Sequence, residues 1–261
     1  MPDDRNPSGE ISARLVSFSG DSGDLPGLND YDGFAEGYTA VNDNGLVHAY
    51  YERPAMLALA GDVAGRRILD AGCGAGALLA ALRERGADVS GIDKSAVMLE
   101  LARRRLGDVA DLRVTELGST LPFPDGTFDD VTASLVLHYL EDWGPALAEI
   151  RRVLKPGGRF IMSVNHPFAA TPWHPGAGPK PDYFATYSYT VEWTAGGKSV
   201  LLRFWNRPLH AMTDAFSATG FRISVISEPT LAPDTPRELL PDDIADGRGF
   251  LCFLFFVLHA G

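Results

Sequence analysis

A glycine-rich turn between two apolar segments constrains this fold more than any other feature of the sequence. Residues 68–71 are predicted to form a short buried strand, and residues 77–85 form a helical segment rich in Ala and Leu. The glycines between them are Gly72, Gly74 and Gly76. Alternating glycines allow a sharp turn with positive φ and let a ligand approach the backbone N–H groups that begin the next helix. The pattern therefore predicts a strand, a ligand-binding turn and a helix.

The turn alone fits two kinds of nucleoside ligand, because residues 72–77 also satisfy the dinucleotide pattern G-x-G-x-x-G/A. A second apolar segment, residues 87–92, ends in Asp93, whose carboxylate could accept both hydroxyls of an adenosine ribose in either ligand. Asp70 separates the two, since a carboxylate before the first glycine suits an ammonium group and would repel a pyrophosphate. We therefore expect a nucleoside that carries an amino acid.

Four segments resemble the class I S-adenosylmethionine-dependent methyltransferases, most closely the branch of ubiquinone- and menaquinone-type and many natural-product enzymes. They occur in the family's order within residues 50–165 and read LDAGCGAG (69–76), GIDKS (91–95), LPFPDGTFD (121–129) and RVLKPGG (152–158). The resemblance implies a Rossmann-like α/β fold, S-adenosyl-L-methionine as the cofactor, and a methyltransferase that uses in-line displacement without a covalent enzyme intermediate.

The apolar segments of the whole chain predict a seven-stranded methyltransferase sheet flanked by helices. Besides the two strands beside the turn, strands are expected at residues 112–116, 130–134, 159–164, 221–227 and 250–258. Helices are expected at residues 31–38, 48–59, 77–85, 96–106, 141–154 and 209–219. Ser95 precedes one of these helices and is expected to cap it.

We divide the chain into a flexible N-terminal arm, residues 1–27, and a methyltransferase domain, residues 28–261. The arm is rich in Gly, Ser, Asp and Pro, which bury too little apolar surface to offset the entropy lost on ordering. After the fifth strand, residues 166–207 form an insertion whose aromatic and apolar alternation predicts a β-hairpin. We interpret it as a lid over an apolar acceptor pocket; the alternative is that it only covers the sheet edge.

The resemblance places the cofactor contacts at the carboxyl ends of the strands, with an aromatic helix of this branch lying over the cofactor. Tyr38 is the first choice from that helix and Tyr31 the second; the alternative is that these aromatic side chains form only a packing face. The predicted cofactor-binding residues are Tyr38, Asp70, Gly72, Cys73, Gly74, Gly76, Asp93, Lys94, Met98, Glu116, Leu117, Ser134 and Leu135. For Met98 a place in the core is the alternative. Ser134 and Leu135 follow strand four, where the reactive sulfonium is expected.

At the third strand the sequence departs from the family's common pattern. Leu117 stands where the family has an Asp, and Glu116 precedes it. Either the Glu116 side chain accepts the adenine amino group, or backbone groups at Leu117 and Gly118 contact the base. Both interpretations stay open at this point.

His138 and His166 are the candidate general bases, because imidazole titrates near neutral pH and both follow strand ends at the active edge. A hydrogen bond to the backbone is the alternative for each. Tyr139, the third candidate catalytic residue, and Asn165 are expected to orient the acceptor. We interpret His48 and His210 as structural, and no His, Cys and carboxylate spacing predicts a metal site.

The composition of the chain limits the kinds of partner that we expect it to bind. A net charge of −11 disfavours nucleic acid, and the longest apolar stretch, residues 250–258, is too short to span a bilayer. Cys73 and Cys252 show no paired spacing, and the polar N-terminus has no signal-peptide pattern, so we expect a cytoplasmic protein. We expect either a monomer or a homodimer. The expected acceptor is a small, partly aromatic or apolar metabolite, as in secondary metabolism.

Two other functions stay open. The first is a protein that binds S-adenosylmethionine but catalyses a non-methylating rearrangement or cyclisation in its apolar pocket. The second, which the sequence favours least, is a nicotinamide-dependent dehydrogenase, because the dinucleotide pattern fits the same turn.

Overall fold

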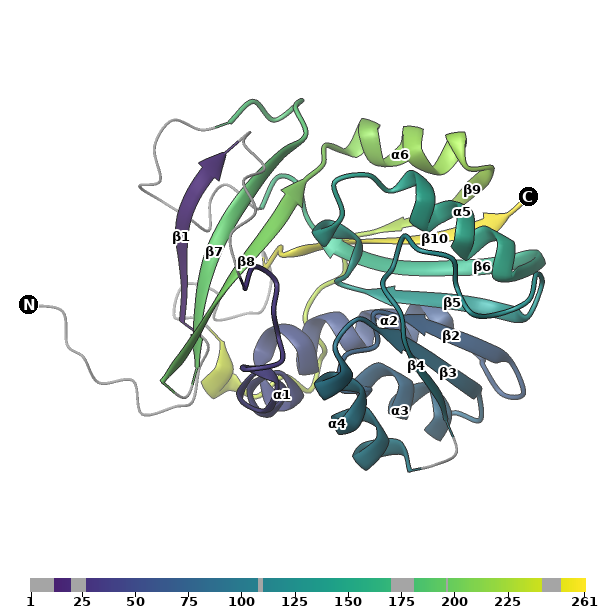
Figure 1. Ribbon diagram of the computed structural model, residues 1–261, viewed down its shortest axis with the longest axis horizontal. Coiled ribbons are helices and arrows are strands. Elements are labelled where there is room, and N and C mark those ends of the chain that lie inside the picture. The colour runs from purple at the N-terminus through teal and green to yellow at the C-terminus, as the bar shows by residue number, and fades with distance from the viewer. Residues whose placement is uncertain (1–11, 20–26, 108–109, 170–180, 196, 241–249) are drawn as a thin grey trace, which may run out of the picture.

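The protein consists of a seven-stranded sheet with helices on both faces and a separate three-stranded sheet beside it (Figure 1). A computed structural model describes residues 12–19, 27–107, 110–169, 181–195, 197–240 and 250–261. The main sheet has the strand order β4-β3-β2-β5-β6-β10-β9, in which β10 alone is antiparallel to its neighbours. The predicted Rossmann-like α/β fold is thereby confirmed.

The main strands follow the apolar segments of the sequence closely. They are β2 (Arg67–Ala71), β3 (Asp88–Asp93), β4 (Asp111–Val114), β5 (Phe128–Ser134), β6 (Leu154–Asn165), β9 (Phe221–Ser227) and β10 (Phe253–Ala260). The largest difference is β6, which begins at Leu154 rather than at residue 159. The Pro-Gly-Gly segment, residues 156–158, therefore lies inside a strand that is irregular at this point, where its pairing with β5 shifts register.

The helices are α1 (Ala35–Asn44), α2 (Arg53–Ala60), α3 (Ala77–Glu84), α4 (Ala96–Leu106), α5 (Gly144–Val153) and α6 (Leu209–Ala218). Helix α4 has the predicted bounds, and the Ser95 hydroxyl caps it by accepting a hydrogen bond from Met98 N at 3.0 Å. Helix α1 begins four residues later than we expected. The helix predicted at residues 48–59 is divided into a π-helical turn, His48–Glu52, and α2.

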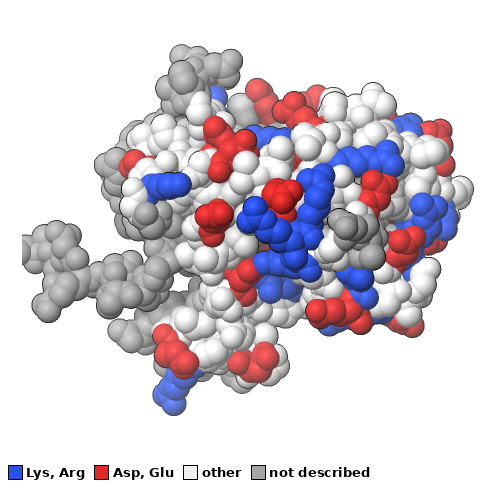
Figure 2. Space-filling model, turned by 60° about the horizontal axis from the view of Figure 1, so that its bottom comes forward, with Lys and Arg blue, Asp and Glu red and all other residues white. Residues whose placement is uncertain are grey.

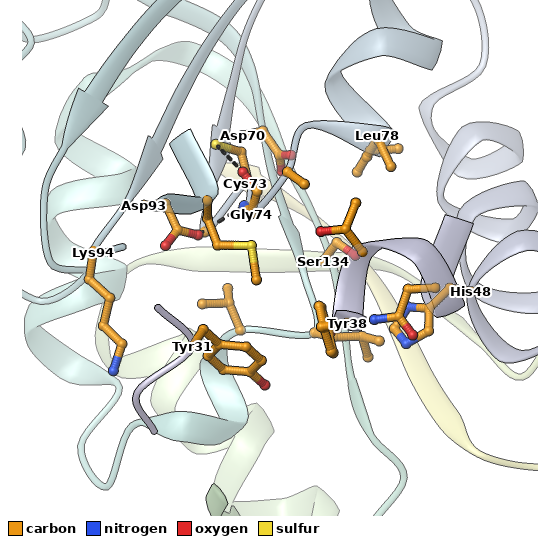
Figure 3. A pocket seen from close by; sticks show the side chains of 18 of the residues that line it. Tyr31, Tyr38, His48, Asp70, Cys73, Gly74, Leu78, Asp93, Lys94 and Ser134 are labelled. Carbon is orange, nitrogen blue, oxygen red and sulfur yellow. Dashed lines mark hydrogen bonds between the residues drawn. The ribbon is translucent and has the colours of Figure 1, made fainter. Parts of the chain in front are cut away.

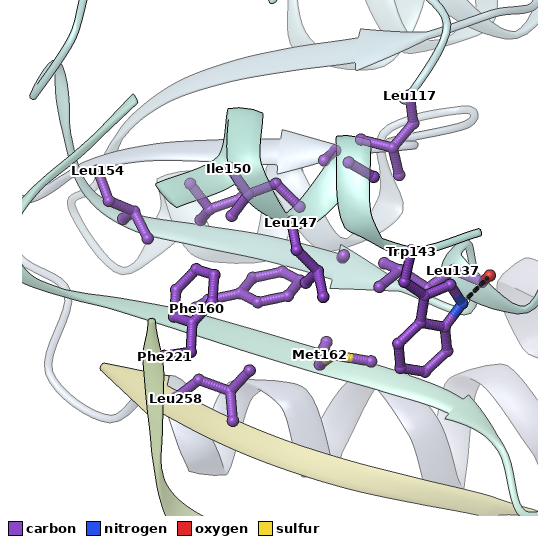
Figure 4. Close-up of a cluster of buried hydrophobic side chains, with 14 of the residues drawn as sticks. Leu117, Leu137, Trp143, Leu147, Ile150, Leu154, Phe160, Met162, Phe221 and Leu258 are labelled. Atoms are coloured by element: carbon purple, nitrogen blue, oxygen red, sulfur yellow. Dashed lines mark hydrogen bonds between the residues drawn. The ribbon is translucent and has the colours of Figure 1, made fainter. Parts of the chain in front are cut away.

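Alternate residues of each central strand point to opposite faces of the sheet. Leu69, Phe160 and Met162 pack with α5 and α6 on one face, whereas Ile68 and Ile161 pack with α2, α3 and α4 on the other. Figure 4 shows the first of these clusters, in which the indole N–H of Trp143 donates to the Leu137 carbonyl at 2.9 Å. Because both faces are covered, ligands have access mainly at the strand ends.

The small sheet joins two parts of the chain that are far apart in sequence. Its strands are β1 (Ser12–Ser19), β7 (Tyr187–Ala195) and β8 (Lys198–Asn206), in the order β1-β7-β8. The hairpin β7–β8 forms as predicted. Strand β1 pairs antiparallel with β7, so the expected arm at residues 1–27 contains regular structure. The rest of the arm up to residue 26, and residues 170–180 and 196 of the insertion, lie outside the described residues.

Candidate active site

A cavity of about 290 Å³ lies at the carboxyl ends of β2, β3 and β5, with α1 beside it. Strands β3 and β4 extend from β2 to one side and β5 and β6 to the other, so the cavity is at the switch point where an open α/β sheet binds its ligand. Figure 3 shows Asp70, Cys73, Gly74 and Asp93 on one side of the cavity and Tyr31 and Tyr38 across it. Every predicted cofactor-binding residue borders this cavity except Gly76. Their binding role stays a prediction.

The turn after β2 has the backbone that its glycines predict. Gly72 and Gly74 have φ values of 81° and 51°. A Cβ on Gly72 would lie 2.5 Å from Val136 Cγ2, whereas one on Gly74 would meet nothing within 4 Å. Gly72 therefore packs against the segment after β5, and Gly74 leaves its backbone open to the cavity.

Asp93 is held by the backbone of the same turn. Its Oδ2 accepts a hydrogen bond from Gly74 N and its Oδ1 accepts one from Ser95 N, both at 2.9 Å. Burial raises the pKa of Asp93, and these two hydrogen bonds oppose the rise. The carboxylate thus has a fixed orientation at the edge of the cavity.

Asp70 is the more deeply buried carboxylate, with 1% of its surface exposed. Thr132 Oγ1 donates to its Oδ1 at 2.8 Å. Burial raises the pKa of Asp70 to about 7, and the negative charges of Glu52 and Asp93 contribute to the rise. A cationic group in the cavity would reverse this effect by favouring the ionised form.

Glu52, Arg53 and His48 also border the cavity, and none of the three was predicted to contact a ligand. The Glu52 carboxylate is 3% exposed, and its Oε1 accepts hydrogen bonds from the hydroxyls of Ser134 and Ser163, both at 2.7 Å. Burial lowers the pKa of His48 to about 4, which leaves the ring neutral at pH 7. The sequence feature that could have indicated a ligand role is the pair Glu52 and Arg53, two adjacent charged residues beside the apolar segment 54–60.

Aromatic side chains form the opposite wall. The hydroxyls of Tyr31 and Tyr139 form a hydrogen bond, and the Tyr38 ring stacks on Trp193 of β7 with 5.8 Å between centroids. Tyr139 packs against Phe204 of β8 at 5.0 Å. Burial raises the pKa of Tyr31, Tyr38 and Tyr139, so these hydroxyls stay protonated at neutral pH. The small sheet thus contacts the residues that line the cavity.

Neither candidate imidazole borders the cavity, whereas Tyr139 does. His138 is 4% exposed, its Nδ1 accepts a hydrogen bond from Asn165 N at 3.3 Å, and burial lowers its pKa to about 3. His166 Nδ1 accepts one from Phe168 N at 3.1 Å, and its Nε2 lies 2.8 Å from Glu228 Oε1. Both rings therefore make the backbone hydrogen bonds that we had considered as the alternative.

Both candidates for contact with the adenine, Glu116 and Leu117, lie at the same part of the cavity. The Met98 side chain is 3% exposed and borders the cavity, as do Glu116 and Leu117. Leu117 is buried and Glu116 is exposed. This arrangement leaves open whether the side chain of Glu116 or the backbone beside it meets the base.

The residues present fit S-adenosyl-L-methionine. Asp70 would hold the ammonium group, Asp93 the ribose hydroxyls and Arg53 the carboxylate, and the open backbone at Gly74 would admit the ligand. Among the described residues, no helix is long and apolar enough to cross a membrane, and no cluster of His, Cys, Asp and Glu is arranged to bind a metal ion.

Comparisons with known proteins agree with this fit. Residues 69–162 match the family described as a methyltransferase domain. The demethylmenaquinone methyltransferase of Symbiobacterium thermophilum is 43% identical over 113 residues, which are 40% of this chain and 45% of that protein. The enzyme of the same name from Beutenbergia cavernae is 35% identical over 158 residues, 59% of this chain and 62% of that protein. The matches thus span about half to three fifths of these relatives.

Solved structures match over a longer part of the chain. An S-adenosylmethionine-dependent methyltransferase from Mesorhizobium loti has a TM-score of 0.64 and 26% identity, over 79% of this chain and 96% of that one. The [4+2]-cyclase SpnF has a TM-score of 0.53 and 20% identity, over 79% and 80% of the two chains, and therefore shares the fold alone.

Proposed function

We propose that this protein, whose domain belongs to the class I S-adenosylmethionine-dependent methyltransferases, transfers a methyl group to an O, N or C atom of a small molecule. The observation that carries the proposal is one cavity in which the turn after β2, Asp70 and Asp93 face the tyrosines that pack on the small sheet. One side suits the cofactor, and the other suits an acceptor beside it.

The cofactor, S-adenosyl-L-methionine, supplies an electrophilic methyl group on a sulfonium when it is bound. Asp70 would accept hydrogen bonds from the ammonium group, Asp93 would accept them from the ribose hydroxyls, and Met98 would pack beside the adenine. Ser134 ends β5 and Leu135 follows it; both border the cavity, as does Tyr139. The residues that would contact the cofactor thus lie at the carboxyl ends of β2, β3 and β5.

The aromatic wall acts by orientation and by exclusion of water. Holding the nucleophile within about 3–3.5 Å of the methyl carbon can supply several kcal/mol of rate enhancement. The hydroxyls of Tyr31, Tyr38 and Tyr139 remain protonated and can donate hydrogen bonds to an acceptor oxygen. We assign no proton transfer to His138 or His166, because neither ring borders the cavity.

A small acceptor is favoured over a nucleic acid. The net charge is −11, and on the face shown in Figure 2 a group of basic side chains near the middle has acidic side chains around it. The three arginines in the last turn of α4 include Arg105, which forms an ion pair with Asp43. A phosphate backbone would require a continuous cationic surface.

The test is calorimetric titration of the purified protein with S-adenosylmethionine and S-adenosylhomocysteine. We expect micromolar binding that the variant Asp93→Ala loses. A screen of small acceptors should then yield S-adenosylhomocysteine, detected by mass spectrometry. Tight binding without S-adenosylhomocysteine from any acceptor would favour a rearrangement or cyclisation, and no binding by the wild type would contradict the proposal.

A further inference from the structure

We infer that Glu52 is a charged member of the cofactor site, and that its carboxylate makes the cavity prefer the cationic S-adenosylmethionine to the uncharged thioether of S-adenosylhomocysteine. The inference rests on the proposed function, because it assumes that the cavity binds this cofactor. It adds a residue outside the four segments that carry the family resemblance.

Glu52 is fixed at the edge of the sheet where the reaction is expected. It is the last residue of the π-helical turn His48–Glu52, and its carboxylate borders the cavity. The hydroxyls that donate to its Oε1 come from Ser134 at the end of β5 and from Ser163 in β6. The carboxylate is therefore held between two neighbouring strands, beside Ser134, which is expected next to the sulfonium.

The second hydroxyl connects Glu52 to the turn that follows β5. Ser163 Oγ also accepts a hydrogen bond from Leu135 N at 3.1 Å. Leu135 has a φ of 52°, a left-handed conformation that is uncommon for a residue with a branched side chain. A strained backbone at this position indicates that the surrounding contacts determine the geometry, the Glu52 anchor among them.

The charges in the cavity complement the cofactor. Within the described part of the chain, neither Glu52 nor Asp70 forms an ion pair; both accept hydrogen bonds from hydroxyl groups. Arg53 borders the cavity as well and forms no ion pair with a described carboxylate; its Nη2 donates to the Asn42 carbonyl at 3.4 Å. Besides Asp93, whose oxygens accept from two backbone N–H groups, the cavity wall thus includes two buried carboxylates, Glu52 and Asp70, and the guanidinium of Arg53, none of which forms an ion pair with another described residue.

S-adenosylmethionine carries two positive groups and one negative group, which are complementary in charge to Glu52, Asp70 and Arg53. Asp70 suits the ammonium and Arg53 suits the carboxylate, which leaves Glu52 for the sulfonium. A buried carboxylate without a cation is unfavourable, and a cationic ligand removes that penalty. The uncharged thioether of the product, S-adenosylhomocysteine, would not remove this penalty. Glu52 would therefore also favour release of the product.

The test compares both ligands by calorimetry in matched variants. Glu52→Gln keeps an oxygen that accepts from both serines but removes the charge. We expect its affinity for S-adenosylmethionine to fall by about tenfold or more, while its affinity for S-adenosylhomocysteine changes by less than about threefold. Glu52→Asp keeps the charge and should keep the preference. The control is Asp70→Asn, which should weaken both ligands alike, because both carry the ammonium group.

Other outcomes have separate meanings. Equal weakening of both ligands in Glu52→Gln, or no change in either, would overturn the inference and leave the proposed function intact. Failure of the wild type to bind either ligand would instead contradict the proposed function. If circular dichroism shows that Glu52→Gln does not fold, Ser163→Ala serves as the second variant. It removes one hydroxyl that donates to the Glu52 carboxylate and so displaces that carboxylate, and Ser163 itself does not border the cavity. The Ser163→Ala variant should bind S-adenosylmethionine more weakly and S-adenosylhomocysteine with nearly unchanged affinity. An unchanged ratio of the two affinities would overturn the inference.

Discussion

Replacement of Asp70 by Asn should stabilise the ligand-free protein at alkaline pH while it abolishes tight cofactor binding. The side chain is 1% exposed, and burial raises its pKa to about 7 from an ordinary value of 3.8. The folded protein therefore retains a proton that the unfolded chain loses between about pH 4 and 7. The stability that this protonated carboxyl contributes is complete below pH 3.8 and is lost as the pH rises through 7.

Relative to a side chain that stays protonated, this pKa difference lowers the free energy of unfolding of the wild type by about 4 kcal/mol at pH 8 and by about 2 kcal/mol at pH 5. Asn has the same shape, its oxygen can still accept from Thr132, and it does not ionise. The free energy of unfolding of Asp70→Asn should therefore exceed that of the wild type by more at pH 8 than at pH 5, with a difference of about 2–3 kcal/mol between the two gains.

Urea unfolding of both proteins at the two pH values measures these gains, and calorimetry with S-adenosylmethionine measures the loss of binding. A gain that does not depend on pH would refute the electrostatic reasoning, because the proton on Asp70 is its only source. Wild-type affinity in Asp70→Asn would refute the ammonium assignment.

Three further predictions concern the turn and its neighbours. Binding of S-adenosylmethionine at pH 7 should release about half a proton from Asp70, which calorimetry in buffers of different ionisation enthalpy detects; Asp70→Asn should release none. His138→Ala should lower the free energy of unfolding by about 2 kcal/mol, measured by urea unfolding, and leave cofactor affinity unchanged, since the ring is buried and does not border the cavity. A tenfold loss of affinity without destabilisation would contradict this placement. Gly72→Ala should cost about 2 kcal/mol or more and Gly74→Ala about 1 kcal/mol in the same assay, because only the first meets Val136; equal costs would contradict the close packing of Gly72 on that side chain.

Local sequence signals predicted the strands, the turn and most of the residues that line the cavity at the carboxyl ends of β2 and β3. The glycine turn, Asp70 and Asp93 lie within two short segments, and the parallel sheet brings these segments together at one edge. The backbone at the turn is determined by glycines that few other residues could replace. For this part of the site, the spacing of residues along the chain was sufficient.

The direction of side chains after a strand end was not predictable in the same way. His138 and Tyr139 are adjacent in a single helical turn, Leu137–Tyr139, yet only Tyr139 borders the cavity. Which of two neighbours points inward depends on the turn that follows β5. Glu52 was missed for a related reason: its serine partners are 82 and 111 residues away in the sequence.

The pairing of β1 with β7 has a practical consequence for work with this protein. Strand β1 covers one edge of the small sheet, and β7 would expose unpaired backbone N–H and C=O groups if residues 1–19 were removed. An open edge of this kind is a template for a strand from another molecule. A shortened form that begins after residue 19 should therefore self-associate, even though it keeps the whole main sheet.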